Sequence, residues 1–227
     1  MIRISESVIK DYITCPKRVN YRINMPEESI ATQPMALGTA VHSTLEKSWR
    51  SSKEALAELE VQLDKNNVKI GREKAYKSIA NFFKSFQELV SEDDVIEKYF
   101  RIPVGNDIFL TGKLDRVSNG IVIDWKTGVT EPEDIERDTQ CMFYYTAYRK
   151  LYNKEPAGVY LVFLAKNKIV SYVPNLAFLN EFENHTIPFV INGIRNNWYP
   201  RNGLFSYKAC KNCSFQNICY TELGILE

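Results

Sequence analysis

Two aspartates and a lysine stand among the apolar residues of a segment that has the pattern of a core β-hairpin. The dipeptide Asn119-Gly120 is a strong signal for a two-residue hairpin turn. Counting outward from that turn places Asp115 directly opposite Asp124, with Cβ atoms roughly 4.5–5.5 Å apart. Lys126 lies two residues beyond Asp124 and therefore on the same face of the hairpin.

Two opposed carboxylates repel each other unless a positive charge neutralises them. A divalent cation is the simplest such charge, and hard oxygen ligands on a rigid hairpin suit Mg²⁺ or Mn²⁺. A lysine beside that ion could polarise a water molecule or stabilise the charge that develops on a phosphate. The hairpin alone is as compatible with a solvated face, in which the lysine bridges two surface acids.

The composition is that of a soluble globular protein. Of the 227 residues, 44% are hydrophobic and 25% are charged. No segment approaches the ~18–20 continuous apolar residues of a membrane span, and the first residues do not have the pattern of a secretory signal. We therefore expect a cytoplasmic protein, or one of the host cytoplasm if the source is viral. The formal net charge is +1, so any surface that binds nucleic acid must be local.

Hydrophobic periodicity along the chain predicts an α/β fold. Helices are expected over residues 5–21 (with a break at Pro16), 38–49, 53–63, 69–90, 138–150 and 176–194, with a loop over 25–35. Strands are expected over residues 95–103, 108–117, 121–126, 158–164 and 168–173. We predict one domain over 1–227, with a mainly helical part (1–94), a core sheet (95–175), and a helix with a cysteine-rich tail (176–227).

The hairpin also resembles a known family. "GKLDRV" followed by "IVIDWKTG" resembles the two core motifs of the PD-(D/E)XK nuclease superfamily, in its RecB-like branch. The resemblance implies a restriction-endonuclease-like fold, in which helices flank a central mixed sheet. It implies that Asp115 and Asp124 bind Mg²⁺ or Mn²⁺, together with the carbonyl of Trp125, and that Lys126 is the catalytic lysine.

Three further segments resemble parts of RecB-like nucleases. "LGTAVHSTLE" resembles their histidine motif and implies that His42 is a metal ligand, although a lone histidine on an amphipathic helix can be structural. "TQCMFYYTAYRK" resembles their Q-x-x-x-Y helix, with Gln140 and Tyr144 on one helix face, where they would support Lys126 or contact DNA. Glu97, in "VIEKYFRIP", stands where the family often has a glutamate, and it could equally be a surface acid.

Four of the five cysteines form a second pattern, which consists of Cys15 near the start and Cys210, Cys213 and Cys219 in the tail. A disulfide framework is disfavoured in a cytosolic protein. Spacing alone does not choose between Zn²⁺ and an iron–sulfur cluster, because both accept four thiolates. The AddB-type and CRISPR-associated RecB-like nucleases have the same arrangement and bind a [4Fe–4S] cluster, so the resemblance implies a structural cluster here.

The resemblance implies a Mg²⁺- or Mn²⁺-dependent deoxyribonuclease that acts as an exonuclease on single-stranded or end-exposed DNA. Endonuclease activity, a homo-oligomer, and partners in DNA repair, recombination or CRISPR adaptation stay open. The alternative is a DNA-binding or scaffold protein with a nuclease fold and little or no cleavage of its own.

Overall fold

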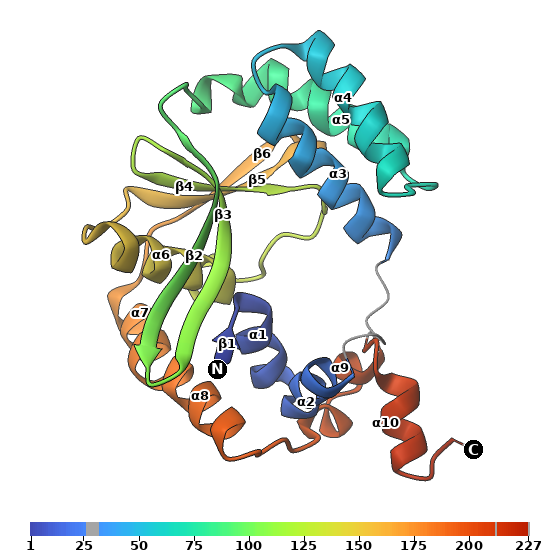
Figure 1. Cartoon of the computed structure of the whole chain (residues 1–227), viewed down its shortest axis with the longest axis vertical. Coiled ribbons are helices and arrows are strands. Elements are labelled where there is room, and N and C mark those ends of the chain that lie inside the picture. Colours follow the sequence, from blue (N-terminus) through green and yellow to red (C-terminus); the bar gives the residue numbers. More distant parts are fainter. Residues whose placement is uncertain (26–31, 212, 227) are drawn as a thin grey trace. The chain divides into compact units, whose positions relative to one another are not determined.

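The computed structural model describes residues 1–25, 32–211 and 213–226 (Figure 1). The chain divides into two compact units, and each unit is assembled from segments that are far apart in the sequence. Unit 1 comprises Met1–Ile30, Pro103–Leu110 and Leu179–Glu227, and unit 2 comprises Ala31–Ile102 and Thr111–Phe178.

A mixed sheet forms the centre of unit 2. Its strands run in the order β3 (Ile108–Ser118), β4 (Ile121–Lys126), β5 (Gly158–Phe163) and β6 (Lys168–Tyr172), and β2 (Val95–Gly105) also pairs with β3. The β3–β4 and β5–β6 pairs are antiparallel, whereas β4 and β5 are parallel and are connected through helix α6 (Thr139–Tyr152). The expected mixed α/β architecture is confirmed, and it fits a restriction-endonuclease-like fold.

The turn of the β3–β4 hairpin is the one that the sequence predicts. Asn119 and Gly120 both have positive φ angles, of 49° and 80°, as a type I′ turn requires. The register pairs Arg116 with Ile123 and Ser118 with Ile121. The predicted register is therefore confirmed over these residues.

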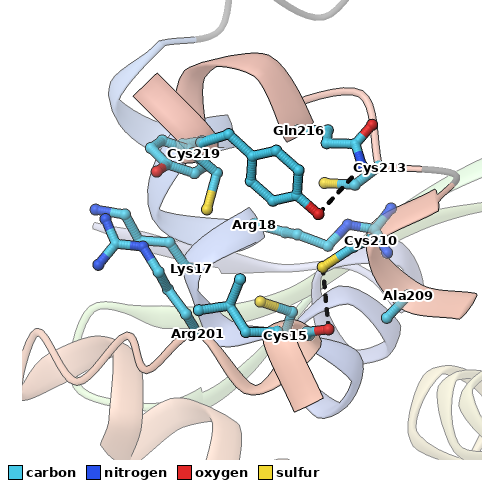
Figure 2. A pocket seen from close by; sticks show the side chains of 13 residues that line it. Cys15, Lys17, Arg18, Arg201, Ala209, Cys210, Cys213, Gln216 and Cys219 are labelled. Atoms are coloured by element: carbon cyan, nitrogen blue, oxygen red, sulfur yellow. Dashed lines mark hydrogen bonds between the residues drawn. The ribbon is translucent and has the colours of Figure 1, made fainter. Parts of the chain in front are cut away.

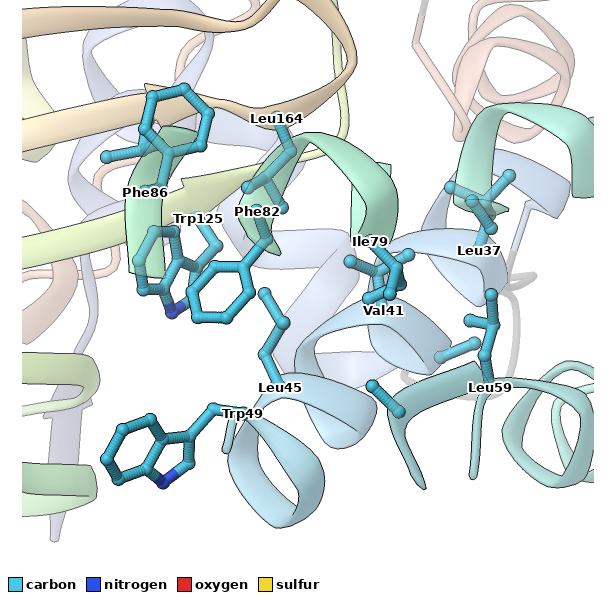
Figure 3. Close-up of a cluster of buried hydrophobic side chains, with 14 of the residues drawn as sticks. Leu37, Val41, Leu45, Trp49, Leu59, Ile79, Phe82, Phe86, Trp125 and Leu164 are labelled. Atoms are coloured by element: carbon cyan, nitrogen blue, oxygen red, sulfur yellow. The ribbon is translucent and has the colours of Figure 1, made fainter. Parts of the chain in front are cut away.

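Three helices pack against one face of β4 and β5, as Figure 3 shows. They are α3 (Gln33–Ser48), α4 (Ser52–Lys65) and α5 (Arg72–Asn81). Apolar residues four apart on α3, Leu37, Val41 and Leu45, make a stripe that meets Trp125 of β4 in one buried cluster. Since side chains alternate along a strand, Asp124 and Lys126 point to the opposite face, where α6 lies.

The structure differs from the expected helices at several ends. The 69–90 helix is α5 followed by a π-helical turn, Phe82–Phe86, and a 3₁₀ turn, Gln87–Leu89. Part of the expected 25–35 loop is helical, because α3 begins at Gln33 with a proline in its first turn. Residues 26–31 of that segment lie outside the described residues.

Unit 1 contains β1 (Ile2–Ile4), which the sequence did not predict, paired parallel with the start of β3. Its helices are α1 (Glu6–Thr14), α2 (Pro16–Asn24), α8 (Ile187–Arg195), α9 (Tyr207–Lys211) and α10 (Gln216–Glu222), while α7 (Leu176–Glu181) spans the division between the units. Tyr12 of α1 lies so close to Gly193 of α8 that a Cβ there would come within 1.8 Å of its hydroxyl. No helix in the described part of the chain is long and apolar enough to cross a membrane.

Candidate active site

His42 of α3 and Asp115 of β3 form the first half of the site. Nδ1 of His42 lies 3.2 Å from Oδ2 of Asp115, and its Nε2 lies 2.6 Å from the carbonyl oxygen of Trp125. Oxygen atoms therefore face both ring nitrogens, which favours the imidazolium form. Burial lowers the pKa of His42, but Asp115, Asp124 and the carbonyl of Trp125 together outweigh burial and raise that pKa to about 9.

Asp115 is also bonded to the neighbouring strand. Its carboxylate accepts the backbone N–H of Trp125 at 3.0 Å. Burial alone would raise the pKa of Asp115. The charge of His42 and the hydrogen bonds from His42 and from the backbone of Trp125 lower that pKa. Asp115 is therefore an ionised, buried carboxylate held by β4 and by α3.

Asp124, Lys126 and two residues of α6 form the second half. Nζ of Lys126 lies 2.8 Å from Oδ2 of Asp124 and donates to Oε1 of Gln140 at 2.6 Å. The amide nitrogen of Gln140 donates to Oδ1 of Asp124 and to the hydroxyl of Tyr144, each at 3.2 Å. Gln140 thus holds the acid and the lysine together, because its amide offers a donor to one and an acceptor to the other.

The two aspartates are neutralised by different cations of the chain. His42 pairs with Asp115, and Lys126 pairs with Asp124. Burial raises the pKa of Asp124, and the nearby charge of Asp115 adds to that rise despite Lys126. Repulsion between the two acids therefore does not by itself require a metal ion, because the fold supplies two compensating charges.

Glu97 joins the first half of the site from β2. Ligand atoms of His42, Glu97 and Asp115 all lie within 4.8 Å of one another. The backbone of Glu97 has a φ of 52°, and the other non-glycine residues with positive φ in the described ranges are asparagines or aspartates. A glutamate rarely adopts this left-handed conformation, which costs about 1–3 kcal/mol and re-aims a strand side chain.

Lys113 is a site residue that sequence reasoning missed. Its ammonium pairs with the carboxylate of Glu97 and lies 5.6 Å from the centre of the Tyr99 ring. Lys113 stands in the "GKLDRV" segment, where no role was assigned to it, and it precedes Asp115 by two residues on the same strand. The period-2 alternation that placed Lys126 beside Asp124 could therefore have placed Lys113 beside Asp115.

The donor set suits a hard divalent cation. Two carboxylates and the carbonyl of Trp125 converge with the imidazole of His42, and carboxylate and carbonyl oxygens are the donors that suit Mg²⁺ and Mn²⁺. Asp124 stands apart from the His42–Glu97–Asp115 group because it is engaged by Lys126 and Gln140. Its buried Oδ2 has no hydrogen bond within the described chain, although the ammonium of Lys126 is near.

The four cysteines of the second pattern line one cavity in unit 1 (Figure 2). Cys15 precedes α2, and Cys210, Cys213 and Cys219 come from α9, α10 and the segment between them. Gly203 lines the same cavity, and a Cβ there would lie 3.3 Å from the sulfur of Cys15 and 3.5 Å from that of Cys210. Cys141 lies in unit 2, where burial raises the pKa of its thiol.

Cations also line the cysteine cavity. Lys17, Arg18 and Arg201 surround it, and carboxylates hold each of them, since Arg18 pairs with Asp11 while Lys17 and Arg201 pair with Glu222. Thiolates are the form that binds metals. Burial raises the pKa of the Cys213 thiol, although a backbone hydrogen bond from Phe215 and the charge of Arg18 lower it.

The comparison with known families agrees with the hairpin and its surroundings. No curated protein matches the chain. The model of the PD-(D/E)XK nuclease superfamily matches residues 3–220, which include the hairpin, α3, α6 and the four cysteines. The chain therefore belongs to the PD-(D/E)XK nuclease superfamily.

Proposed function

We propose that the protein is a Mg²⁺- or Mn²⁺-dependent deoxyribonuclease, and that it acts as an exonuclease on single-stranded or end-exposed DNA. The observation that carries the proposal is the convergence of His42, Glu97 and Asp115 beside the Lys126–Asp124 pair. Nucleases of this superfamily generally depend on divalent metal ions, and a nuclease domain binds DNA.

His42, Glu97, Asp115 and the carbonyl of Trp125 would hold the ion, and Asp124 would complete the set once Lys126 turns from it. When bound, the ion would lower the pKa of a water molecule and offset charge on the scissile phosphate. His42 must present a neutral ring nitrogen to a metal, so ion binding would release its proton.

Lys126 would act on the reacting phosphate and water, and Gln140 would position it. The amide oxygen of Gln140 fixes the ammonium at 2.6 Å, and Tyr144 in turn receives the amide N–H of Gln140. A lysine anchored in this way would present its positive charge to the phosphate without a search through rotamers.

We also propose that Cys15, Cys210, Cys213 and Cys219 hold a [4Fe–4S] cluster that links α2 to the tail of unit 1. The close approach of Gly203 supports a cradle built around a bound group. The resemblance to RecB-like nucleases that have the same cysteine arrangement supports a cluster over a single Zn²⁺ ion at this site.

Digestion of end-labelled single strands tests the activity. We expect degradation with Mn²⁺ and none with EDTA, and a circular single strand should survive if the enzyme needs an end. Asp115→Asn and Asp124→Asn should abolish cleavage, while Asp93→Asn, at an exposed acid in the turn before β2, should cleave as the wild type does. DNA binding without Mn²⁺-dependent cleavage would refute the nuclease and favour the scaffold alternative.

A further inference from the structure

A groove of about 400 Å³ opens in unit 2 next to the candidate active site. The starts of α3 and α5 line it, together with Thr127 and Gly128, which directly follow Lys126. Its volume falls in the range of ~300–1,000 Å³ that is typical of sites for small organic ligands. The groove therefore has room for a nucleotide but not for a duplex.

The groove continues the active site along two elements. Thr127 is the residue after Lys126, and α3 crosses it closely, since a Cβ on Gly38 would lie 3.4 Å from its hydroxyl oxygen. Gly38 is one helical turn before His42, which corresponds to about 6 Å along the helix. That distance is one to two steps of a stacked strand at ~3.4 Å per nucleotide. A strand with its phosphate at His42 and Lys126 would thus reach the groove with the next nucleotides.

The walls combine an apolar surface with positive charge. Met35 and Ile70 are 59% and 73% exposed, so both apolar side chains are accessible in the groove that they line. Lys74 lines the groove without an ion-pair partner in the described chain. None of the described lining side chains is acidic, and Glu73, in the first turn of α5, does not line the groove.

The wall formed by the segment before α5 is held in a fixed shape. The side-chain oxygen of Gln33 accepts the backbone N–H groups of Lys69 and Ile70, at 2.7 and 3.2 Å, and its nitrogen donates to the carbonyl of Asn67. Gly71 then begins α5 without a side-chain cap, so that the positive end of the helix dipole meets the groove. The exposure of Ile70 is therefore fixed by a loop that hydrogen bonds hold in place.

We propose that this groove binds a nucleotide of an unpaired DNA strand, adjacent to the scissile phosphate. Met35 and Ile70 would contact the base or sugar, and Lys74 with the start of α5 would bind the phosphate. A base is free to enter such a pocket only when it is unpaired, so the groove would select single strands or frayed ends. The inference rests on the proposed nuclease function and adds the part of the substrate that the site reads.

Fluorescence anisotropy of a labelled oligothymidine of about 12 nucleotides, in Ca²⁺ to prevent turnover, measures this contact directly. Ile70→Ser and Lys74→Ala test the apolar and the charged wall. Val61→Ser and Lys77→Ala are matched controls, because both residues are exposed, one on α4 and one on α5, and neither lines the groove. Equal melting temperatures of each pair would show that the fold is intact.

We expect each groove variant to weaken binding of the single strand by about three- to tenfold, with less loss for a blunt hairpin duplex. Lys74→Ala should also reduce the slope of log K against log salt by about 0.7, the value for one phosphate contact in a single strand. Groove variants that bind as the controls do would overturn the proposal, and so would equal losses for single strand and duplex.

The same experiment separates this proposal from the nuclease function. Hydrolysis of bis(para-nitrophenyl) phosphate by the wild type with Mn²⁺ reports on the metal site without any flanking nucleotide. If the wild type hydrolyses neither this ester nor DNA, while the groove variants bind the single strand more weakly, the result would refute the nuclease and support the groove. Hydrolysis of both substrates with unchanged affinity in the variants would refute the groove alone.

Discussion

Replacement of Lys126 by methionine tests the proposed roles in the site, because it removes the ammonium and keeps most of the side chain. Lys126 lies 2.8 Å from Asp124, whose side chain is 5% exposed, whereas its own side chain is 27% exposed. The variant therefore leaves a buried carboxylate without its cation, in a part of the fold that the α6 helix covers.

The cost to stability follows from this geometry. Removing one partner of a fully buried ion pair costs about 3–5 kcal/mol. Lys126 is partly solvated, and burial has already raised the pKa of Asp124, so the carboxyl can take up a proton in the variant. We expect a loss of about 1–3 kcal/mol, which lowers Tm by about 3–10 °C for a chain of this size.

Turnover should change differently from metal binding. A lysine that acts on the developing charge contributes to the transition state, so single-turnover cleavage should fall by about 10²–10³-fold. The affinity for Mn²⁺, measured by calorimetry, should stay equal or rise, because a cation that competes for Asp124 is gone. Mn²⁺ should then raise the Tm of Lys126→Met at least as much as that of the wild type.

Two results would refute this reasoning. Cleavage at the wild-type rate would favour a solvated face, in which the lysine only bridges surface acids. A large loss of Mn²⁺ affinity would mean that Lys126 organises the ligands. Lys166→Met is the control, since its pair with the surface acid Glu131 is solvated and contributes roughly 0–1 kcal/mol.

Three other predictions concern neighbouring parts of the molecule. Gln140→Leu should reduce turnover about tenfold or more with little change in Mn²⁺ affinity, and Gln140→Glu should restore part of it if the oxygen that holds the ammonium is what matters. Cys213→Ser should lower Tm and remove the brown colour, which is the visible absorbance of the iron–sulfur cluster. A variant with unchanged colour and Tm would contradict the ligand assignment. Asp94→Ala should cost about 3–5 kcal/mol by denaturant unfolding, because it strands the buried guanidinium of Arg116, whereas Glu92→Ala should cost less than 1 kcal/mol at the surface. Burial raises the pKa of Asp94, but the hydrogen bonds that its carboxylate accepts outweigh burial and lower that pKa. The stability that the ionised Asp94 contributes should therefore be present above the unfolded pKa of about 3.9 and disappear as pH falls below that value.

The hairpin and α6 could be predicted because local rules determine them. Asn119-Gly120 fixes a turn that few other sequences favour, and the register of the strands follows from it. Gln140 and Tyr144 are four residues apart, so any helix there places them on one face, and the structure joins them by a hydrogen bond. These features depend on residues close in the sequence, and their placement needs no knowledge of the rest of the fold.

Charge compensation in the site could not be predicted in the same way. The opposed acids Asp115 and Asp124 indicate repulsion, and for the hairpin alone a metal ion is the simplest charge that could neutralise them. The structure brings His42 from a helix more than seventy residues earlier, and it orients Lys126 toward one acid only. Which cation meets which carboxylate depends on tertiary packing, and no local pattern encodes it.

The direction of the Glu97 side chain could not be predicted from the sequence pattern of β2. Alternation along β2 assigns its side chain to a face, but a residue with φ of 52° breaks the alternation at that point. The conformation is costly for a glutamate, and the surroundings must hold it, which Lys113 and the neighbouring strand do. A glutamate kept there at such a cost, with its carboxylate beside His42 and Asp115, is more simply explained by a ligand role than by a surface one. Glu97→Gly should then relieve the backbone and remove the carboxylate, so that thermal stability without metal is retained or rises while Mn²⁺ affinity falls; a variant that loses stability and keeps its affinity would show that the carboxylate serves the fold.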